Sequence, residues 1–256
     1  MTDDAAGGEG VLSRAARMLR AFGADDDSLS AADLGHRTGL PRSTAHRLAA
    51  ELAGLGLLDR TADGGFTIGT GLWEMGELAP VSMRLREHAL PHVLRLYEAS
   101  GENVHIAVLS SPDPATAEAL YVARVTGPNS IPTLSRMGGR HPLHTTGVGK
   151  ALLAQQEDDW LDAFFQRTFE RETVYSIVDV VPLRDEIAHA RARGFATTRQ
   201  EMTLGNVSIA AALPAIDGLP LAAVGVVTHL ARADERRLGP LVVAAARDIA
   251  RDLARD

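Results

Sequence analysis

The sequence predicts an α+β protein that begins with a winged helix-turn-helix domain. Two short helical segments between Ser30 and Leu48 are joined by a tight glycine turn, and a glycine-rich β-hairpin follows them. An apolar helical segment precedes them, and farther along the chain strand-like and helical runs alternate. Together these observations predict a small helical domain followed by a sheet with helices packed around it.

The helix-turn-helix is expected to begin at Ser30. Asp33 follows three residues later, a spacing that resembles a capping box, in which both side chains accept bonds from backbone N–H groups of the first turn. Gly39 is expected to end the first helix. Pro41 suits the first position of the second helix, because its fixed φ fits there and its missing N–H costs nothing. The second helix is expected to end near Ala53.

The second helix has two different faces. The apolar face, which is expected to pack, carries Ala45, Leu48 and Leu52, with Leu55 just beyond. The polar face, which suits the major groove of DNA, carries Arg42, Ser43, His46 and Arg47. Any amphipathic hairpin with a solvated polar face shows the same pattern, so the flanking elements have to decide between the two interpretations.

The flanking elements favour DNA binding. Residues 57–60 and 66–68 are short apolar runs around a glycine-rich turn, a pattern typical of a β-hairpin and therefore of a wing. Upstream, an apolar stripe at helical spacing ends at Gly23 and supplies the first helix of a three-helix core. That stripe consists of Leu12, Ala15, Ala16, Leu19 and Phe22. Residues 11–71 are therefore predicted to form a winged helix-turn-helix domain.

The net charge does not by itself point to DNA. The chain carries a formal charge of −7, and residues 11–71 hold seven arginines and seven acidic residues, so a general basic patch is absent. The acids at 25–27 are grouped in one loop, whereas Arg42, Arg47 and Arg60 bracket the polar face of the second helix. Non-specific binding is expected to be weak, and a dimer or a pair of dimers is needed to gather enough phosphate contacts.

Residues 72–90 are predicted to form a linker helix. Leu72, Met75 and Leu78 lie at helical spacing, and Pro80 interrupts the helix before a second polar stretch at 82–88. Such a helix has apolar surface but no domain of its own to cover it. It either packs on the winged domain or crosses its equivalent in a second subunit.

Residues 91–256 show a pattern of strands and helices. The expected helices are 92–99, 147–155, 160–169, 183–193 and 234–253. The strand-like runs are 103–109, 119–125, 131–135, 195–199, 207–213 and 221–228. This order suggests an antiparallel or mixed sheet with helices around it, and the loop 110–117 is rich in turn formers and is expected to be exposed.

Two motifs resemble catalytic or metal sites without meeting their requirements. The run Gly147–Lys150 resembles a phosphate-binding loop, but His144 stands where that loop needs glycine and Ala151 where it needs a hydroxyl group. His141, His144 and the distant His105 have no carboxylate or other obvious partner for a metal ion. No nucleotide triphosphatase activity and no metal are expected.

The remaining composition also argues against an enzyme. Ser110, Ser111 and Ser208 lack the glycine-flanked context of a hydrolase nucleophile, so no catalytic residue and no cofactor are expected. The absence of cysteine excludes disulfides and thiolate metal sites. No apolar run reaches the length of a membrane span, and the acidic start 1–10 lacks the features of a secretory signal. A cytoplasmic protein is expected.

Residues 145–149 allow two interpretations. Their small and hydroxylated side chains suit a helix N-terminus, where free N–H groups and the helix dipole can hold an anion such as a carboxylate. Alternatively, the glycines only permit close packing.

Several motifs resemble those of the IclR family of bacterial transcription regulators. They are the runs 39–48, 139–154, 193–201 and 209–213, together with Gly205, and they occur in the family's order over nearly the whole chain. The resemblance implies a GAF- or PAS-like effector-binding fold for residues 91–256. It also favours the linker helix that crosses a second subunit.

The resemblance also suggests site residues. The residues expected to contact DNA bases and phosphates are Arg42, Ser43, Thr44, His46 and Arg47, with Arg60 of the wing on the backbone. A ligand carboxylate is implied at the backbone of Gly147 and Val148, and Thr146 is expected to be a further effector-binding residue. The opposite wall, which is less polar here than in some relatives, is expected to consist of Thr198, Ser208, Gly225 and Val227. This wall suggests a larger, partly apolar acid.

The sequence therefore predicts a ligand-responsive regulator, a repressor rather than an activator, of a catabolic or metabolic operon. Its expected partners are an operator in double-stranded DNA, a small organic or aromatic acid, and further copies of the chain in a homodimer or a dimer of dimers. The alternative is a GAF-like small-molecule sensor whose winged domain mediates protein contacts. Steep salt dependence and preference for the protein's own promoter region distinguish the first hypothesis from the second.

Overall fold

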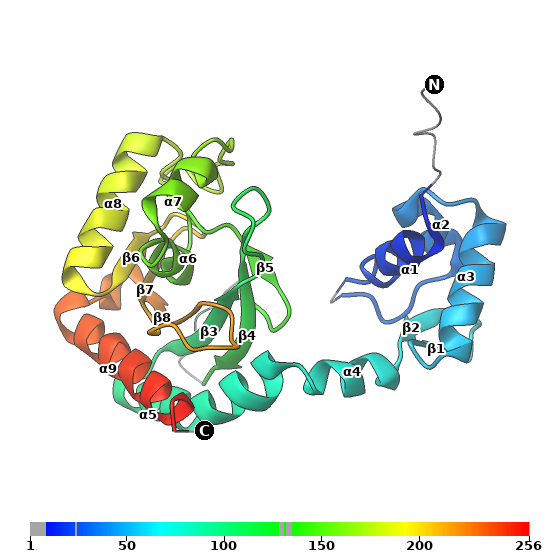
Figure 1. Cartoon of the computed structure of the whole chain (residues 1–256), viewed down its shortest axis with the longest axis horizontal. Coiled ribbons are helices and arrows are strands. Elements are labelled where there is room, and N and C mark those ends of the chain that lie inside the picture. Colours follow the sequence, from blue (N-terminus) through cyan, green and yellow to red (C-terminus); the bar gives the residue numbers. More distant parts are fainter. Residues whose placement is uncertain (1–8, 24, 128–130, 132–134, 256) are drawn as a thin grey trace. The chain divides into compact units, whose positions relative to one another are not determined.

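A computed structural model of the chain describes residues 9–23, 25–127, 131 and 135–255 (Figure 1). The chain packs as two compact units, one that ends at Ala79 and one that begins at Pro80. Among the described residues, no helix combines the length and apolar character that a bilayer span requires.

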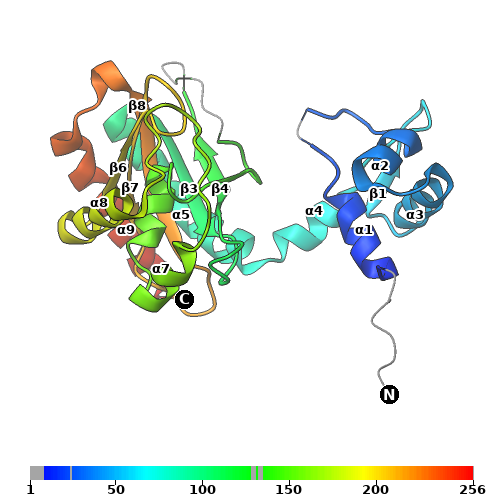
Figure 2. The ribbon, with the colours of Figure 1, turned by 90° about the horizontal axis from the view of Figure 1, so that it is seen from above.

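The first unit contains a three-helix core and a two-stranded antiparallel sheet. Figure 2 shows its three core helices grouped together. Buried apolar side chains from all three helices and from both strands form one cluster, centred on Met18, Leu34, Leu48, Leu58 and Phe66. The elements are α1 (Val11–Leu19), α2 (Ala31–Thr38), α3 (Arg42–Gly54), β1 (Leu58–Arg60), β2 (Phe66–Ile68) and α4 (Thr70–Glu77).

The helix-turn-helix has the local geometry that its sequence predicts. The side chain of Ser30 accepts a bond from the Asp33 amide, and the Asp33 carboxylate accepts one from the Ser30 amide, so the capping box is complete. Gly39 ends α2 in the left-handed region, with φ of 67°. One detail of the prediction is wrong: Pro41 caps α3 from outside, and Arg42 is the first helical residue.

Two apolar residues predicted to pack are instead exposed. Leu12 lies in the first turn of α1 and is 82% exposed, while Met18 provides the fully buried contact of that helix. Leu55 is 68% exposed, because α3 has already ended at Gly54 and the chain turns away through Gly56. The polar face of α3 and the hairpin are placed as expected.

The second unit is built on an antiparallel sheet with strand order β5-β4-β3-β8-β7-β6. The strands are β3 (Asn103–Leu109), β4 (Ala119–Val125), β5 (Arg140–His141), β6 (Ala196–Arg199), β7 (Asn206–Ala212) and β8 (Ala222–His229). The helices are η1 (Val81–Arg86), α5 (Glu87–Ser100), α6 (Gly147–Leu153), α7 (Asp158–Phe164), α8 (Val180–Arg193), η2 (Leu230–Arg232) and α9 (Glu235–Leu253). The α+β prediction is confirmed.

Helices cover both faces of this sheet. Helices α5 and α9, which lie side by side in Figure 1, pack on one face through alternate strand residues such as Val104, Ile209 and Val226. Helices α6, α7 and α8 contribute to a second apolar cluster on the other face, which includes Ala107, Tyr121 and other strand residues. The central strands are consequently buried on both sides, which explains their nearly continuous apolar sequences.

Some boundaries differ from the sequence predictions. Within the range 72–90 assigned to a linker, Leu85 and Ala89 are buried in the core of the second unit, so the unit begins well before residue 91. Helix α5 accordingly starts at Glu87 rather than at residue 92. Of the strand expected at 131–135, Ile131 and Ser135 lie outside any strand, and 132–134 fall outside the described residues.

Candidate functional site

Helix α3 presents a polar face beside the wing. Arg42, Ser43, His46 and Arg47 are exposed, Thr44 is half-buried, and the opposite face is buried in the core. This arrangement matches the geometry of a recognition helix, whose exposed edge enters the major groove.

The buried Phe66 connects this helix to the wing. The His46 ring lies edge-on to the Phe66 ring, with centroids 6.3 Å apart, and the Arg60 guanidinium lies 5.1 Å from the same ring centroid. Phe66 also pairs with Leu29 through two backbone hydrogen bonds. One fully buried aromatic side chain therefore fixes a residue of α3 and a residue of the wing relative to each other.

The acidic loop after α1 is partly neutralised within the first unit. Arg37 on α2 donates to both carboxylate oxygens of Asp26, at 2.8 Å from Nη2 to Oδ1. The bond from Arg37 is the main cause that holds the pKa of Asp26 below its ordinary value. Asp25 and Asp27 are exposed.

The second unit contains a cavity where the N-terminus of α6 meets the sheet. About 440 Å³ of space not occupied by atoms lies there, the open solvent at its mouth included. Polar and apolar side chains share the lining, so the cavity suits a small molecule that has both characters. The lining residues are Tyr121, Ser135, His141, Thr145, Thr146, Gly147, Thr198, Glu201, Met202, Thr203, Asn206, Ser208 and Val227.

The strand register explains how one wall forms. Thr198 pairs with Ser208 across β6 and β7, and Ser208 pairs with Val227 across β7 and β8. Directly opposed residues in neighbouring strands point to the same face of a sheet, so these three side chains form a row. Opposite them, the Thr146 side chain caps α6, accepting from the Gly149 amide at 3.2 Å.

Tyr121 connects the central sheet to this cap. Burial raises the pKa of Tyr121 well above its ordinary value, and the neighbouring Thr146 side chain opposes that rise. The Thr146 hydroxyl in turn donates to the Pro142 carbonyl at 2.8 Å. Two hydrogen bonds therefore fix the Thr146 side chain at the edge of the cavity that Tyr121 also lines.

The structure brings together five of the seven residues that the sequence suggests for the effector. Val148 and Gly225 do not line the cavity. A Cβ added to Gly225 would lie 3.2 Å from Val148 Cγ1, so these two residues pack against each other where α6 meets β8. The five predicted residues that do line the cavity are Thr146, Gly147, Thr198, Ser208 and Val227.

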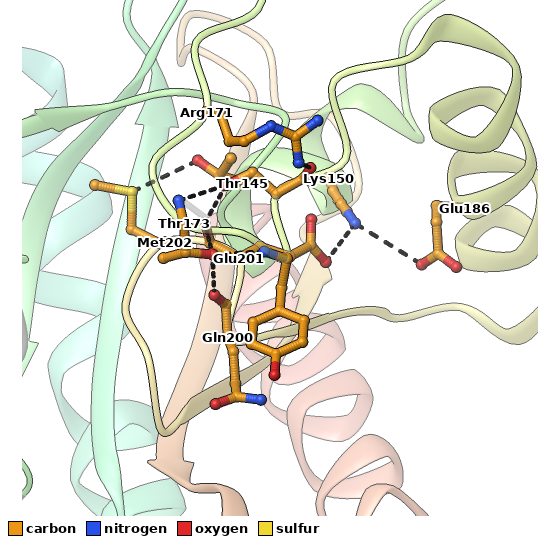
Figure 3. A network of polar contacts seen from close by, with 10 residues as sticks. Thr145, Lys150, Arg171, Thr173, Glu186, Gln200, Glu201 and Met202 are labelled. Atoms are coloured by element: carbon orange, nitrogen blue, oxygen red, sulfur yellow. Dashed lines mark hydrogen bonds and ion pairs between the residues drawn. The ribbon is translucent and has the colours of Figure 1, made fainter.

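Most of the other lining residues are not predicted from the sequence, and Glu201 is the most informative of them. Lys150, the only lysine of the chain, is fully buried in α6, and its Nζ lies 2.8 Å from Glu201 Oε1 and 3.8 Å from Glu186 Oε2 (Figure 3). A single lysine inside an apolar helix was the signal for a buried ion pair.

The segment between α7 and α8 holds Glu201 and its neighbours through hydrogen bonds. Thr173 Oγ1 donates to the Gln200 carbonyl at 2.6 Å (Figure 3). Ser176 Oγ donates to the Glu201 carbonyl at 2.7 Å. Gln200 has φ of 59°, a left-handed conformation that is uncommon for this residue type. The segment that lines the cavity is thus fixed by bonds from outside the sheet.

Two of the three histidines considered as metal ligands, His105 and His141, contact the Tyr121 ring, and His144 lies apart from them. His144 Nε2 lies 2.9 Å from the Glu170 carbonyl oxygen, whereas His105 is buried beside Tyr121, with ring centroids 5.1 Å apart. The described part of the chain holds no group of three side chains that could bind a metal ion.

A winged helix-turn-helix unit joined to an α+β unit with a small-molecule cavity defines the class of DNA-binding transcription regulators with an effector-binding domain. The family model for the IclR helix-turn-helix domain matches residues 11–62, and the model for the bacterial transcriptional regulator IclR C-terminal domain matches residues 79–255. The chain belongs to the IclR family, and it is a transcription regulator rather than an enzyme.

Individual relatives agree with this assignment. The Transcriptional repressor IclR of Escherichia coli is 28% identical over 93% of this chain and 88% of its own length. The Glycerol operon regulatory protein of Streptomyces coelicolor is 32% identical over 96% of this chain and 95% of its own length. The structure of an IclR homolog from Microbacterium hydrocarbonoxydans, complexed with 4-hydroxybenzoate, matches with a TM-score of 0.88 and 30% identity, over 96% of this chain and 100% of that one.

Proposed function

We propose that this regulator represses a catabolic or metabolic operon and responds to a small organic acid, aromatic acids included. The observation that carries this proposal is the cavity, which combines the N-terminus of α6 with a wall of small and apolar side chains. The relative complexed with 4-hydroxybenzoate supports an aromatic acid as one member of the effector class.

The carboxylate of the effector is assigned to the first turn of α6. The first N–H groups of a helix have no partner within the helix, and the positive end of the helix dipole favours an anion. The Thr146 hydroxyl accepts a hydrogen bond from the N–H of Gly149, so that N–H is not available to a ligand. We assign the carboxylate to the N–H group of Gly147, beside the Thr146 side chain, because Val148, the other residue that the resemblance suggests for this contact, does not line the cavity.

The remainder of the effector is assigned to the opposite side of the cavity. Val227, Met202 and the ring of Tyr121 provide apolar surface, and Thr198 and Ser208 provide hydroxyl groups. A mixed lining of this kind favours an acid with an apolar body over a very small, wholly polar acid.

DNA contact is assigned to α3 and the wing. Arg42, Ser43, Thr44, His46 and Arg47 supply base and phosphate contacts, and Arg60 contacts the backbone. A dimer or a dimer of dimers places two or more such helices on one operator. Because its target is the operator, we assign the protein to the cytoplasm.

The exposed apolar residues of α4 support self-association. Trp73 is 66% exposed, Met75 53% and Leu78 70%, more apolar surface than a short helix of a lone subunit commonly leaves in water. We assign this surface to the corresponding helix of a second copy.

One experiment tests both halves of this proposal. The full chain is bound to labelled DNA from upstream of its own gene, and 4-hydroxybenzoate, benzoate and phenylacetate are then titrated in. We expect specific binding and release by at least one acid. Val227→Phe, which fills the cavity, should retain DNA binding and lose release, whereas the control Val174→Phe, at a position 77% exposed, should behave as the wild type.

The outcomes separate the alternatives. Absence of sequence preference and of salt dependence would favour a winged domain that contacts proteins. Specific DNA binding without a response to any of these acids would contradict the aromatic-acid effector and leave the DNA assignment intact.

A further inference from the structure

Glu201 is a cavity-lining carboxylate with only one of its oxygens engaged. The residue is 5% exposed, and its Oε1 accepts from Lys150 Nζ at 2.8 Å. Its Oε2 is buried and has no hydrogen-bond partner among the described residues. A buried acceptor without a partner costs free energy, and more so when it is part of a charged group.

The surroundings fix this carboxylate in place. Its main-chain carbonyl accepts from Ser176, its side chain is held by Lys150, and Lys150 is also close to Glu186 on α8 (Figure 3). Burial raises the pKa of Glu201, while the charge and hydrogen bond of Lys150 oppose that rise. The open oxygen is thus a preorganised acceptor rather than a mobile surface group.

We infer that Glu201 determines effector specificity by accepting a hydrogen bond at Oε2 from a hydroxyl group of the bound acid. This inference rests on the proposed function, and it narrows the effector class from organic acids to hydroxylated organic acids.

The chemistry of the site favours a neutral donor over other groups. A cationic donor such as an ammonium group would meet the nearby charge of Lys150. A second carboxylate on the effector would be repelled by Glu201 itself. An apolar group would leave Oε2 buried and unpaired. A hydroxyl group satisfies the oxygen without adding charge, and sites built to bond a substrate hydroxyl discriminate strongly against analogues that lack it.

Three probes of one size class test the inference: 4-hydroxybenzoate carries a donor, 4-methoxybenzoate only an acceptor, and benzoate neither. Their affinities for the full chain are measured by calorimetry. The wild type should bind the hydroxyl compound at least about tenfold more tightly than either analogue, as expected for a hydrogen bond to a charged group.

Glu201→Gln replaces the unpaired acceptor Oε2 with a hydrogen-bond donor. Lys150 can only donate, so the amide oxygen stays with Lys150 and the amide NH₂ replaces Oε2. The ratio of hydroxyl to methoxy affinity should then fall about tenfold or more, because the methoxy oxygen can accept from the amide. Glu186→Gln removes the second carboxylate near Lys150, which does not line this cavity. This variant should leave the ratio of hydroxyl to methoxy affinity unchanged. Circular dichroism verifies that each variant is folded.

An unchanged ratio in Glu201→Gln, or equal changes in both variants, would overturn the inference. If the wild type binds these acids without preferring the hydroxyl compound, this inference fails and the proposed function stands. If the wild type binds none of them, the aromatic-acid effector of the proposed function fails as well.

Discussion

Gly147 lies directly against Ser208. A Cβ added to Gly147 would collide with Ser208 Oγ and lie 2.9 Å from Ser208 Cβ. This contact seats the first residue of α6 on β7 at the edge of the cavity. The glycine is therefore required for close packing, whichever ligand the helix N-terminus holds.

We expect Gly147→Ala to destabilise the second unit by about 1–3 kcal/mol, the usual cost of an overpacked methyl group. Urea unfolding measures the change. Adding Ser208→Gly removes both of the closest atoms and should restore part of the loss. The control Gly76→Ala adds a methyl group where an added Cβ meets nothing within 4 Å. Equal effects of the two alanines would contradict the packing argument.

A second prediction concerns His105. Burial, followed by the charges of Arg124 and His141, lowers its pKa from 6.5 to about 3. Below pH 6.5 the unfolded chain binds a proton that the folded chain does not, so stability is retained above that pH and is lost as the pH falls toward 3. The contribution of this residue is about 1.4 kcal/mol per pH unit within that range.

His105→Phe should remove that part of the pH dependence. Denaturant unfolding at a series of pH values measures it, and His189→Phe, at an exposed position on α8, is the control. If the free energy of unfolding of both variants changes with pH as steeply as that of the wild type, the buried neutral histidine does not contribute to acid sensitivity.

The fold could be predicted where local rules and tertiary packing agree. Ser30, Gly39 and the hairpin turn determine their elements through short-range bonds, so the winged domain was predicted from the sequence. Leu12 and Leu55 have the correct spacing for burial, yet they lie where a helix begins or has just ended. Spacing alone does not show how far a neighbouring element extends over a helix.

The site was predictable only in part, because its lining comes from distant segments. Thr198, Ser208 and Val227 come together through strand register, which a resemblance can suggest. Glu201 comes into contact with Lys150 only after β6 folds beside α6. Gly225 is close in sequence to Val227, but its partner is Val148 in the packed layer behind the cavity.

A third prediction concerns assembly. Leu78→Glu places a charge on the exposed apolar surface of α4, and it should weaken self-association and operator binding together. Analytical ultracentrifugation and gel-shift titration measure the two effects. Glu74→Ala, at an exposed position of the same helix, is the matched control. A wild type that is monomeric at micromolar concentration would contradict the assigned role of α4.

Operator binding by the polar face of α3 tests the central claim most directly. Binding of the full chain to DNA upstream of its own gene is measured by footprinting and fluorescence anisotropy, for the wild type, Arg42→Ala and Arg47→Ala. Arg247→Ala, which removes an equal charge from the exposed side of α9, is the control. We predict a partially palindromic site with half-sites about 34 Å apart, and a loss of about 1–3 kcal/mol in specific binding for each α3 variant. Unchanged affinity of both α3 variants for the protected site would contradict the assignment of α3 as the recognition helix.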